Sequence, residues 1–147
     1  MFRGSYAATV DAKGRMKIPT AFKSILDEKY GPDFFITSLS GEHVRIYPIE
    51  VWERLEGKLA ILPSMNKAKR KFLERANRWG QMNRMDAQGR VLIPPQLRES
   101  AAMQGEVTVL GYLEEYLEVW NKERFTEHLE QDPMTDEDEK ALSDLNI

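Results

Sequence analysis

The sequence contains no cysteine among its 147 residues, which excludes disulfide bonds, thiol catalysis and cysteine-based zinc or iron–sulfur sites. Its only imidazoles, His43 and His128, lie far apart in the sequence, so a histidine-rich metal site is excluded as well. No apolar run approaches the roughly 18 residues that a membrane-spanning helix needs, and no signal-peptide core follows the opening Met1–Gly4 segment. These absences predict a soluble cytosolic protein that binds no metal and enters no membrane.

Motifs of enzymes are lacking too. Neither a phosphate-cradling G-x-x-x-x-G-K-S/T loop nor a G-x-G-x-x-G segment is present. Neither histidine has a nearby nucleophile that would mark a catalytic triad. The acidic run Asp136–Glu139 lacks the spacing and the glycine of an EF-hand. The sequence therefore predicts no enzyme, no cofactor and no small-molecule substrate.

Charge is unevenly distributed, although the net charge is only −3. Residues 130–147 carry seven acidic residues and one lysine, so residues 1–129 are net positive by three. Two segments are strongly basic: residues 1–23 hold five basic residues against one acid, and residues 65–90 hold eight against two. The acidic total therefore does not argue against a nucleic-acid partner.

An internal repeat is the most informative feature of the sequence. Residues 11–20 read D-A-K-G-R-M-K-I-P-T and residues 86–95 read D-A-Q-G-R-V-L-I-P-P, with six of ten positions identical. The match continues at the same offset through Phe22/Leu97 and Lys23/Arg98. The chain is therefore expected to contain two copies of one small unit. Its 41% hydrophobic residues are enough to fill a core. A unit of about 45 residues buries too little surface alone, so the copies are expected to interlock or exchange strands.

Each unit is expected to begin with a β-hairpin. Aspartate at the first turn position and glycine at the fourth are typical of a type I turn, and the sequence places them twice, as Asp11/Gly14 and Asp86/Gly89. These four residues are therefore predicted to form and orient the hairpin turns. In the strand after the first turn, basic and apolar side chains alternate, so the basic ones are expected to face away from the core.

The rest of each unit is expected to contain a short helix, a second strand pair and a further helix. In the first copy the predicted strands are residues 5–10, 15–18, 34–39 and 44–47, and helices are predicted after Pro19 and after Tyr47. The first of these helices is expected to stop at Gly31. The aromatic pairs Tyr47/Trp52 and Trp120/Phe125 have the spacing of a hydrophobic staple, the second around an expected N-cap at Asn121.

The connector between the repeats, from Glu53 to Arg78, is expected to be helical. Its apolar stripe is Ala68, Phe72, Ala76 and Trp79, and its basic face is Lys67, Arg70, Lys71 and Arg78. That face would line DNA, bind an acidic surface or simply be solvated. A capped helix is expected after Thr135. The acids of that helix would lower non-specific DNA affinity or dock onto a basic neighbour.

The two D-A-x-G-R segments, the opening M-F-R-G, the S-M-N of the connector and the stretch Gly111–Trp120 together resemble the MraZ family of bacterial proteins. The resemblance implies two AbrB-type (swapped-hairpin) repeats per chain, a closed homo-oligomeric ring, and an Asp-x-x-x-Arg hairpin that faces DNA. It also implies a cytoplasmic, nucleoid-associated transcriptional regulator. Such proteins bind short direct repeats upstream of their own gene, at the head of the division and cell-wall gene cluster, and usually repress it.

Six basic residues are predicted to contact DNA, namely Arg3, Lys13, Arg15, Lys17, Arg84 and Arg90. Arg15 and Arg90 would read base edges or hold phosphates through the planar guanidinium group. They could instead brace the turns by pairing with Asp11 and Asp86, and the two roles are compatible.

The other predicted contacts also have a second possible role. Arg3, Lys13 and Lys17 would contact phosphates and set register, or would form a solvated strand face. In the second copy Gln88 and Leu92 replace two lysines of the first, so the first hairpin is expected to dominate DNA affinity.

The predicted fold class is α+β, with two pseudo-symmetric AbrB-like swapped-hairpin β repeats, short helices and a helical connector, assembling into a ring. The predicted organisation is repeat 1 at residues 5–50, a basic helical connector at 51–78, repeat 2 at 79–122, and a C-terminal helix with an acidic tail at 123–147. The predicted function is sequence-specific binding of promoter DNA and repression. The alternative is an antitoxin-like or scaffold ring that mainly binds a protein partner.

Overall fold

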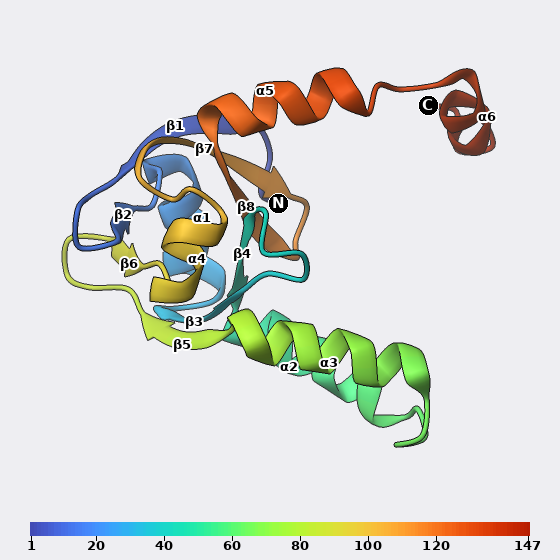
Figure 1. The fold of residues 1–147 in the computed structure, drawn as a ribbon, viewed down its shortest axis with the longest axis horizontal. Coiled ribbons are helices and arrows are strands. Elements are labelled where there is room, and N and C mark those ends of the chain that lie inside the picture. Colours follow the sequence, from blue (N-terminus) through green and yellow to red (C-terminus); the bar gives the residue numbers. More distant parts are fainter.

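A computed structural model describes all residues, 1–147, and shows one eight-stranded sheet with helices packed against it and projecting from it (Figure 1). In chain order the elements are β1 (Ser5–Val10), β2 (Arg15–Lys17), α1 (Thr20–Lys29), β3 (Asp33–Thr37), β4 (Val44–Pro48), α2 (Ile49–Ala60), α3 (Lys67–Trp79), β5 (Gln81–Arg84), β6 (Arg90–Leu92), α4 (Pro95–Ser100), β7 (Gly105–Tyr112), β8 (Tyr116–Asn121), α5 (Lys122–Gln131) and α6 (Asp136–Ser143). The strand order in the sheet is β5-β3-β4-β8-β7-β1-β2-β6. The predicted α+β class is confirmed.

The two repeats exchange strands. β1 of the first repeat pairs along its whole length with β7 of the second, and β5 of the second pairs with β3 of the first. β2 and β6, the equivalent strands of the two hairpins, pair antiparallel with Met16 opposite Val91. The interlocking expected from the small size of each unit is confirmed, since neither repeat could form this sheet alone.

The two edge strands of the sheet lie close to one another and nearly close it. The side-chain Oδ1 of Asn83 on β5 accepts a hydrogen bond from the backbone N–H of Leu92 on β6 at 3.0 Å. This contact joins β5 and β6 at the place where backbone hydrogen bonds between the two strands would be needed to close the sheet. As a result, the exposed edges that would invite pairing with other chains are short.

The main core draws on both repeats. Its fully buried side chains include Met16 and Val91 from the paired hairpins, Phe22 and Leu26 from α1, and Leu97 from α4. The apolar side chains of α1 therefore face the core. Burial of this kind supplies most of the stability that a single 45-residue unit would lack.

The connector forms a helical hairpin rather than one helix. The helical prediction is confirmed over α2 and α3 but is wrong at residues 61–66, where Pro63 cannot continue a helix. The predicted apolar stripe of α3 is also only partly correct. Ala76 is buried and the ring of Phe72 stacks on Trp52 at 6.2 Å, but Ala68 is exposed because it lies near the free end of the hairpin.

The predicted caps and staples are confirmed. The side chain of Asn121 accepts hydrogen bonds from two backbone N–H groups at the start of α5, and the rings of Trp120 and Phe125 lie 5.8 Å apart. The equivalent Tyr47 and Trp52 rings lie 5.0 Å apart. Thr135 and Asp138 form a reciprocal capping box that starts α6. Because these features depend on neighbours along the chain, the sequence alone was sufficient to predict them.

Replacing Gly57 in the interior of α2 is expected to stabilise the protein. No heavy atom lies within 4 Å of a Cβ added at this position. Alanine loses less backbone entropy than glycine in a helix, so Gly57→Ala should raise the free energy of unfolding by about 0.5–1 kcal/mol. Urea denaturation measures this, and a lower denaturation midpoint would mean that α2 is not a regular helix at this residue.

Candidate nucleic-acid interface

The first hairpin turn is organised by the carboxylate of Asp11. Its Oδ1 accepts hydrogen bonds from the backbone N–H groups of Lys13 and Arg15, each at 2.9 Å, and its Oδ2 accepts one from Nε of Arg15 at 2.8 Å. The backbone N–H of Gly14 donates to the carbonyl of Asp11 at 2.9 Å, which closes the turn, and Gly14 has a φ of +83°. A single carboxylate therefore fixes both the loop and the arginine that follows it.

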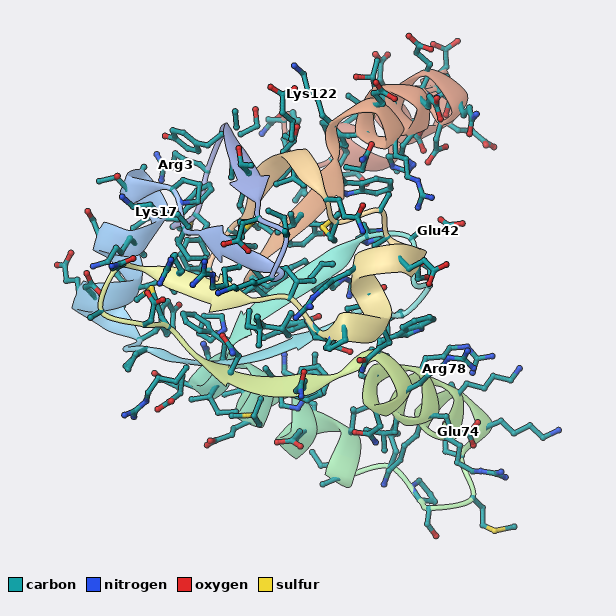
Figure 2. All side chains as sticks on the ribbon, turned by 60° about the vertical axis from the view of Figure 1, so that its left-hand side comes forward. Arg3, Lys17, Glu42, Glu74, Arg78 and Lys122 are labelled. Atoms are coloured by element: carbon teal, nitrogen blue, oxygen red, sulfur yellow. The ribbon has the colours of Figure 1, made fainter.

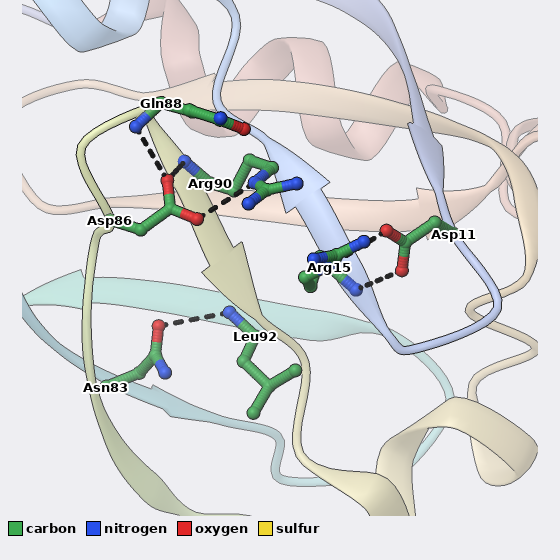
Figure 3. A network of polar contacts seen from close by, with 7 residues as sticks. All are labelled: Asp11, Arg15, Asn83, Asp86, Gln88, Arg90 and Leu92. Atoms are coloured by element: carbon green, nitrogen blue, oxygen red, sulfur yellow. Dashed lines mark hydrogen bonds and ion pairs between the residues drawn. The ribbon is translucent and has the colours of Figure 1, made fainter.

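The second hairpin repeats this arrangement, as Figure 3 shows. Oδ1 of Asp86 accepts from the backbone N–H groups of Gln88 and Arg90, each at 2.9 Å, and Oδ2 accepts from Nε of Arg90 at 2.8 Å. Gly89 closes the turn with a φ of +77°. The two Asp-x-x-x-Arg segments are thus the same structure built twice.

The braced arginines remain available for a ligand. The side chains of Arg15 and Arg90 each donate to the aspartate only through Nε, and neither terminal guanidinium nitrogen donates a hydrogen bond within the chain. Their side chains keep 36% and 29% of their surface exposed. Bracing the turn and contacting DNA are therefore compatible, because the ends of the guanidinium groups are free.

The aspartates stay charged at neutral pH. Backbone N–H donation from Arg15 lowers the pKa of Asp11, and the same donation from Arg90 lowers the pKa of Asp86. Hydrogen bonds donated to the ionised carboxylate stabilise it and so lower its pKa. Since both pKa values fall below the ordinary value of 3.8, the turns are expected to keep this geometry throughout the neutral range.

The pairing of β2 with β6 gathers charge from both hairpins on one face. Lys17 lies opposite Arg90 and Arg15 lies opposite Leu92 in the register, while Met16 and Val91 between them point into the core. Positions two apart on a strand, and residues directly opposite on the next strand, share a face. The outward face of this ribbon therefore carries three cations and the exposed Leu92, with no acid on the strands themselves.

Two further basic residues lie over the hairpins, and the sequence did not reveal their position. Lys23 of the first repeat packs on the turn of the second, where a Cβ added to Gly89 would lie 3.0 and 3.1 Å from its Cε and Cδ. Arg98 of the second repeat packs on the turn of the first, where a Cβ on Gly14 would overlap its guanidinium group. The equivalence of Lys23 and Arg98 was visible in the repeat, but their crossing to the opposite hairpin depends on the strand exchange.

Gly14→Ala is expected to destabilise the protein, because the φ of Gly14 is left-handed and the added Cβ would displace Arg98. Gly31→Ala is the matched control, since Gly31 has a φ of +95° but open space around it. Both variants should lose about 1 kcal/mol from the backbone alone, and Gly14→Ala should lose more. Thermal unfolding compares them. Equal losses of stability in the two variants would show that Arg98 moves aside without cost and does not pack firmly on the first turn.

The other predicted contact residues lie apart from this ribbon. Lys13 is exposed in the first turn. Arg3 precedes β1 at the end of that strand away from the turn, roughly 20 Å along the strand direction. Figure 2 shows Arg3 and Lys17 on the same side of the molecule, across from Arg78 on α3. The structure thus places Arg15, Lys17 and Arg90 on one ribbon, whereas Arg3 lies outside the ribbon, before β1.

Arg84 is committed to an ion pair. Its Nε and Nη2 donate to the two carboxylate oxygens of Asp33 at 2.9 and 3.0 Å, and Asp33 is its direct partner in the β3–β5 register. The hydrogen bond from Arg84 lowers the pKa of Asp33. A bidentate pair uses one edge of the guanidinium fork, so Arg84 has less donor capacity for DNA than Arg15 or Arg90.

The two histidines pack on the same tryptophan. The rings of His43 and His128 stack on Trp120 at 4.4 and 4.5 Å, and burial lowers the pKa of His43. The stack of His128 on Trp120 therefore helps to hold α5 against β8. No group of three or more His, Asp or Glu side chains is arranged to hold a metal ion. No helix in the structure has both the length and the apolar character to span a bilayer.

The interlocked repeats and the two Asp-braced hairpins define a two-repeat swapped-hairpin protein of the AbrB type. A family model described as "MraZ protein, putative antitoxin-like" matches residues 1–75 and 81–145. The transcriptional regulator MraZ of Acidobacterium capsulatum is 54% identical over 147 residues, and that of Koribacter versatilis is 49% identical over 148 residues. The transcriptional regulator MraZ of Halothermothrix orenii is 35% identical. All three alignments cover the whole of both chains.

This chain therefore belongs to the MraZ family, as its motifs predicted. The family is one of transcriptional regulators rather than of enzymes.

Proposed function

We propose that this protein binds promoter DNA sequence-specifically through the outward face of the β2–β6 ribbon and represses transcription from it. The observation that carries the proposal is the convergence of Arg15, Lys17 and Arg90 on one exposed face, with both arginines pre-oriented by aspartates. A two-stranded ribbon fits the major groove of B-DNA. Pre-orientation lowers the entropy that the arginines lose on binding.

The residues divide into two roles under this proposal. Arg15 and Arg90 read base edges, because a guanidinium group can donate two hydrogen bonds to one base. Lys17 and Lys13, with Arg3 further along β1, neutralise phosphates and set register without reading sequence. Arg84 is a minor contact, since Asp33 occupies its fork. Leu92 gives the face one apolar contact where the first repeat has a lysine.

Affinity is proposed to come from several copies acting together. One ribbon makes few contacts, so a single chain binds weakly. A homo-oligomeric ring presents many ribbons, and each tethered contact benefits from a high effective concentration at tandem direct repeats. The targets proposed are the direct repeats upstream of the protein's own operon, with the division and cell-wall gene cluster behind them. The protein would accordingly act in the cytoplasm, associated with the nucleoid.

Footprinting of the DNA upstream of the native coding sequence tests this function. The protein should protect the tandem repeats at concentrations that leave the flanking DNA open, and a promoter fusion should lose expression when the protein is supplied. Uniform protection of all the DNA would contradict sequence-specific binding. An antitoxin-like role remains the second candidate because the family description includes that word. Under it, a stoichiometric protein partner would compete with promoter DNA.

A further inference from the structure

The C-terminal arm, defined as residues 132–147, extends from the body without packing on it. No residue of α6 is buried, and only Leu142 within the arm is even partly shielded. Ala141, Leu142 and Leu145 fall on one face of this helix and its continuation, and Leu145 keeps 69% of its surface exposed. A helix of eight residues is marginal in water even with a capping box. The apolar face of α6 is therefore unpartnered.

A second unpartnered surface lies at the hairpin tip, defined as residues 58–71. Ile61 and Met65 expose 84% and 85% of their surface, and Leu62 exposes 39%. The same segment holds five basic residues and no acid, the basic residues being Lys58, Lys67, Lys69, Arg70 and Lys71. An apolar patch with a charged rim is typical of an interaction surface.

The arm and the tip are complementary in charge. Residues 130–139 contain six acids and no base, and no acid of α6 forms an ion pair within the chain. Of the five bases of the tip, only Arg70 is paired, with Glu74 at 3.7 Å. Two surfaces that are both apolar at the centre and opposite in charge at the rim are suited to bind each other.

The arm does not reach the tip of its own chain. Figure 1 shows α6 at the upper right and the free end of the α2–α3 hairpin at the lower right, well separated on the same side of the body. α5 is fixed to the body, because Nη1 of Arg124 donates to the carbonyl of Ser100 at 2.9 Å and Asn121 donates to that of Ala102 at 3.1 Å. Only four residues separate α5 from α6, and a chain spans at most about 3.6 Å per residue. The partner of the arm is therefore another molecule.

We propose that the arm of one copy docks on the hairpin tip of a second copy, so that α6 packs on Ile61 and Met65 and its acids face the lysines of the tip. This contact joins two different surfaces, and repeated head-to-tail contacts of this kind build a ring when the rotation between neighbouring copies closes. The inference rests on the homo-oligomeric assembly proposed above and names the surfaces that build it. It assigns the acidic arm to assembly rather than to DNA.

A charge-swap cycle tests the contact in the full-length protein. The arm variant is Asp136→Lys with Glu137→Lys, which leaves the capping-box residue Asp138 in place. The tip variant is Lys67→Glu with Lys71→Glu. Each should weaken self-association about tenfold in sedimentation velocity, and the chain carrying both pairs should recover it. Glu28→Lys with Glu42→Lys, at exposed positions away from both surfaces, is the matched control and should leave the assembly unchanged.

The absence of native cysteine allows a second measurement. Glu139→Cys and Lys67→Cys are made in separate chains and mixed under oxidising conditions, and they should yield a covalent dimer that neither Glu28→Cys nor Glu42→Cys forms with Lys67→Cys. A chain with both cysteines that forms only an internal disulfide would overturn the second copy as partner. An assembly that persists unchanged in both charge variants would overturn this contact alone. A wild-type chain that stays monomeric would remove both this contact and the ring, and DNA binding is measured separately.

Discussion

Arg15→Ala is expected to weaken binding to the tandem-repeat promoter by roughly 10- to 100-fold, and by more than Arg90→Ala. Both arginines are braced in the same way and are similarly exposed, so geometry does not distinguish them. The difference lies in their neighbours. The first hairpin carries Lys13 and Lys17, whereas the second has Gln88 and Leu92 at those positions. A base contact is held more firmly where phosphate contacts fix the register.

Fluorescence anisotropy with a labelled duplex measures both losses. Arg54→Ala is the control, because Arg54 is exposed on α2, away from the ribbon, and it should bind as the wild type does. Circular dichroism melts should show that the variants remain folded. Equal losses for Arg15→Ala and Arg90→Ala would defeat the dominance of the first hairpin, and no loss for either would remove the ribbon from the interface.

Phe2→Ala is expected to lower the free energy of unfolding by about 3–5 kcal/mol. Only 1% of Phe2 is exposed, and its ring lies edge-on to Phe22 at 5.9 Å and stacked on Tyr30 at 6.0 Å. Its backbone N–H donates to the carbonyl of Leu113. The N-terminal segment passes directly over Gly111 on β7, where a Cβ would overlap the backbone of Phe2. Removing the ring leaves a cavity that the exchanged strands β1 and β7 hold open.

Guanidinium denaturation compares Phe2→Ala with Leu113→Ala. The comparison separates the contribution of the Phe2 ring from that of the backbone hydrogen bond between Phe2 and Leu113. Leu113 keeps 62% of its surface exposed, and alanine retains the carbonyl that bonds Phe2, so the control should change by about 0.5 kcal/mol or less. A loss below about 1 kcal/mol for Phe2→Ala would mean that the N-terminal segment is not part of the core.

The local features of this protein could be predicted from its sequence because they depend on neighbours along the chain. The D-x-x-G spacing indicated both turns, and Asn121 and Thr135 indicated two helix starts that the structure confirms. The repeat indicated that the units interlock. Pro63 could have predicted the break between α2 and α3, because proline rarely continues a helix, but the helical interpretation of the connector did not use it.

The long-range arrangement could not be predicted in the same way. Nothing in the local pattern of β1 specifies β7 as its partner, because register and partner choice depend on packing between distant segments. The pairing of Arg84 with Asp33 and the crossing of Lys23 and Arg98 onto the opposite turns follow from that exchange. The sequence grouped Arg3 and Arg84 with the hairpin cations. In the structure the ribbon itself carries Arg15, Lys17 and Arg90, and Arg84 pairs with Asp33 instead.

An anisotropy titration tests the central claim most directly. It compares a duplex that carries the tandem repeats upstream of the native gene with a scrambled duplex, at two salt concentrations. Much tighter binding to the repeats is expected at both, with an affinity that falls as salt rises, because each neutralised phosphate adds about 0.9 to the logarithmic salt slope. Equal affinity for the two duplexes, lost together at higher salt, would contradict sequence-specific recognition and leave only a basic surface that meets phosphate.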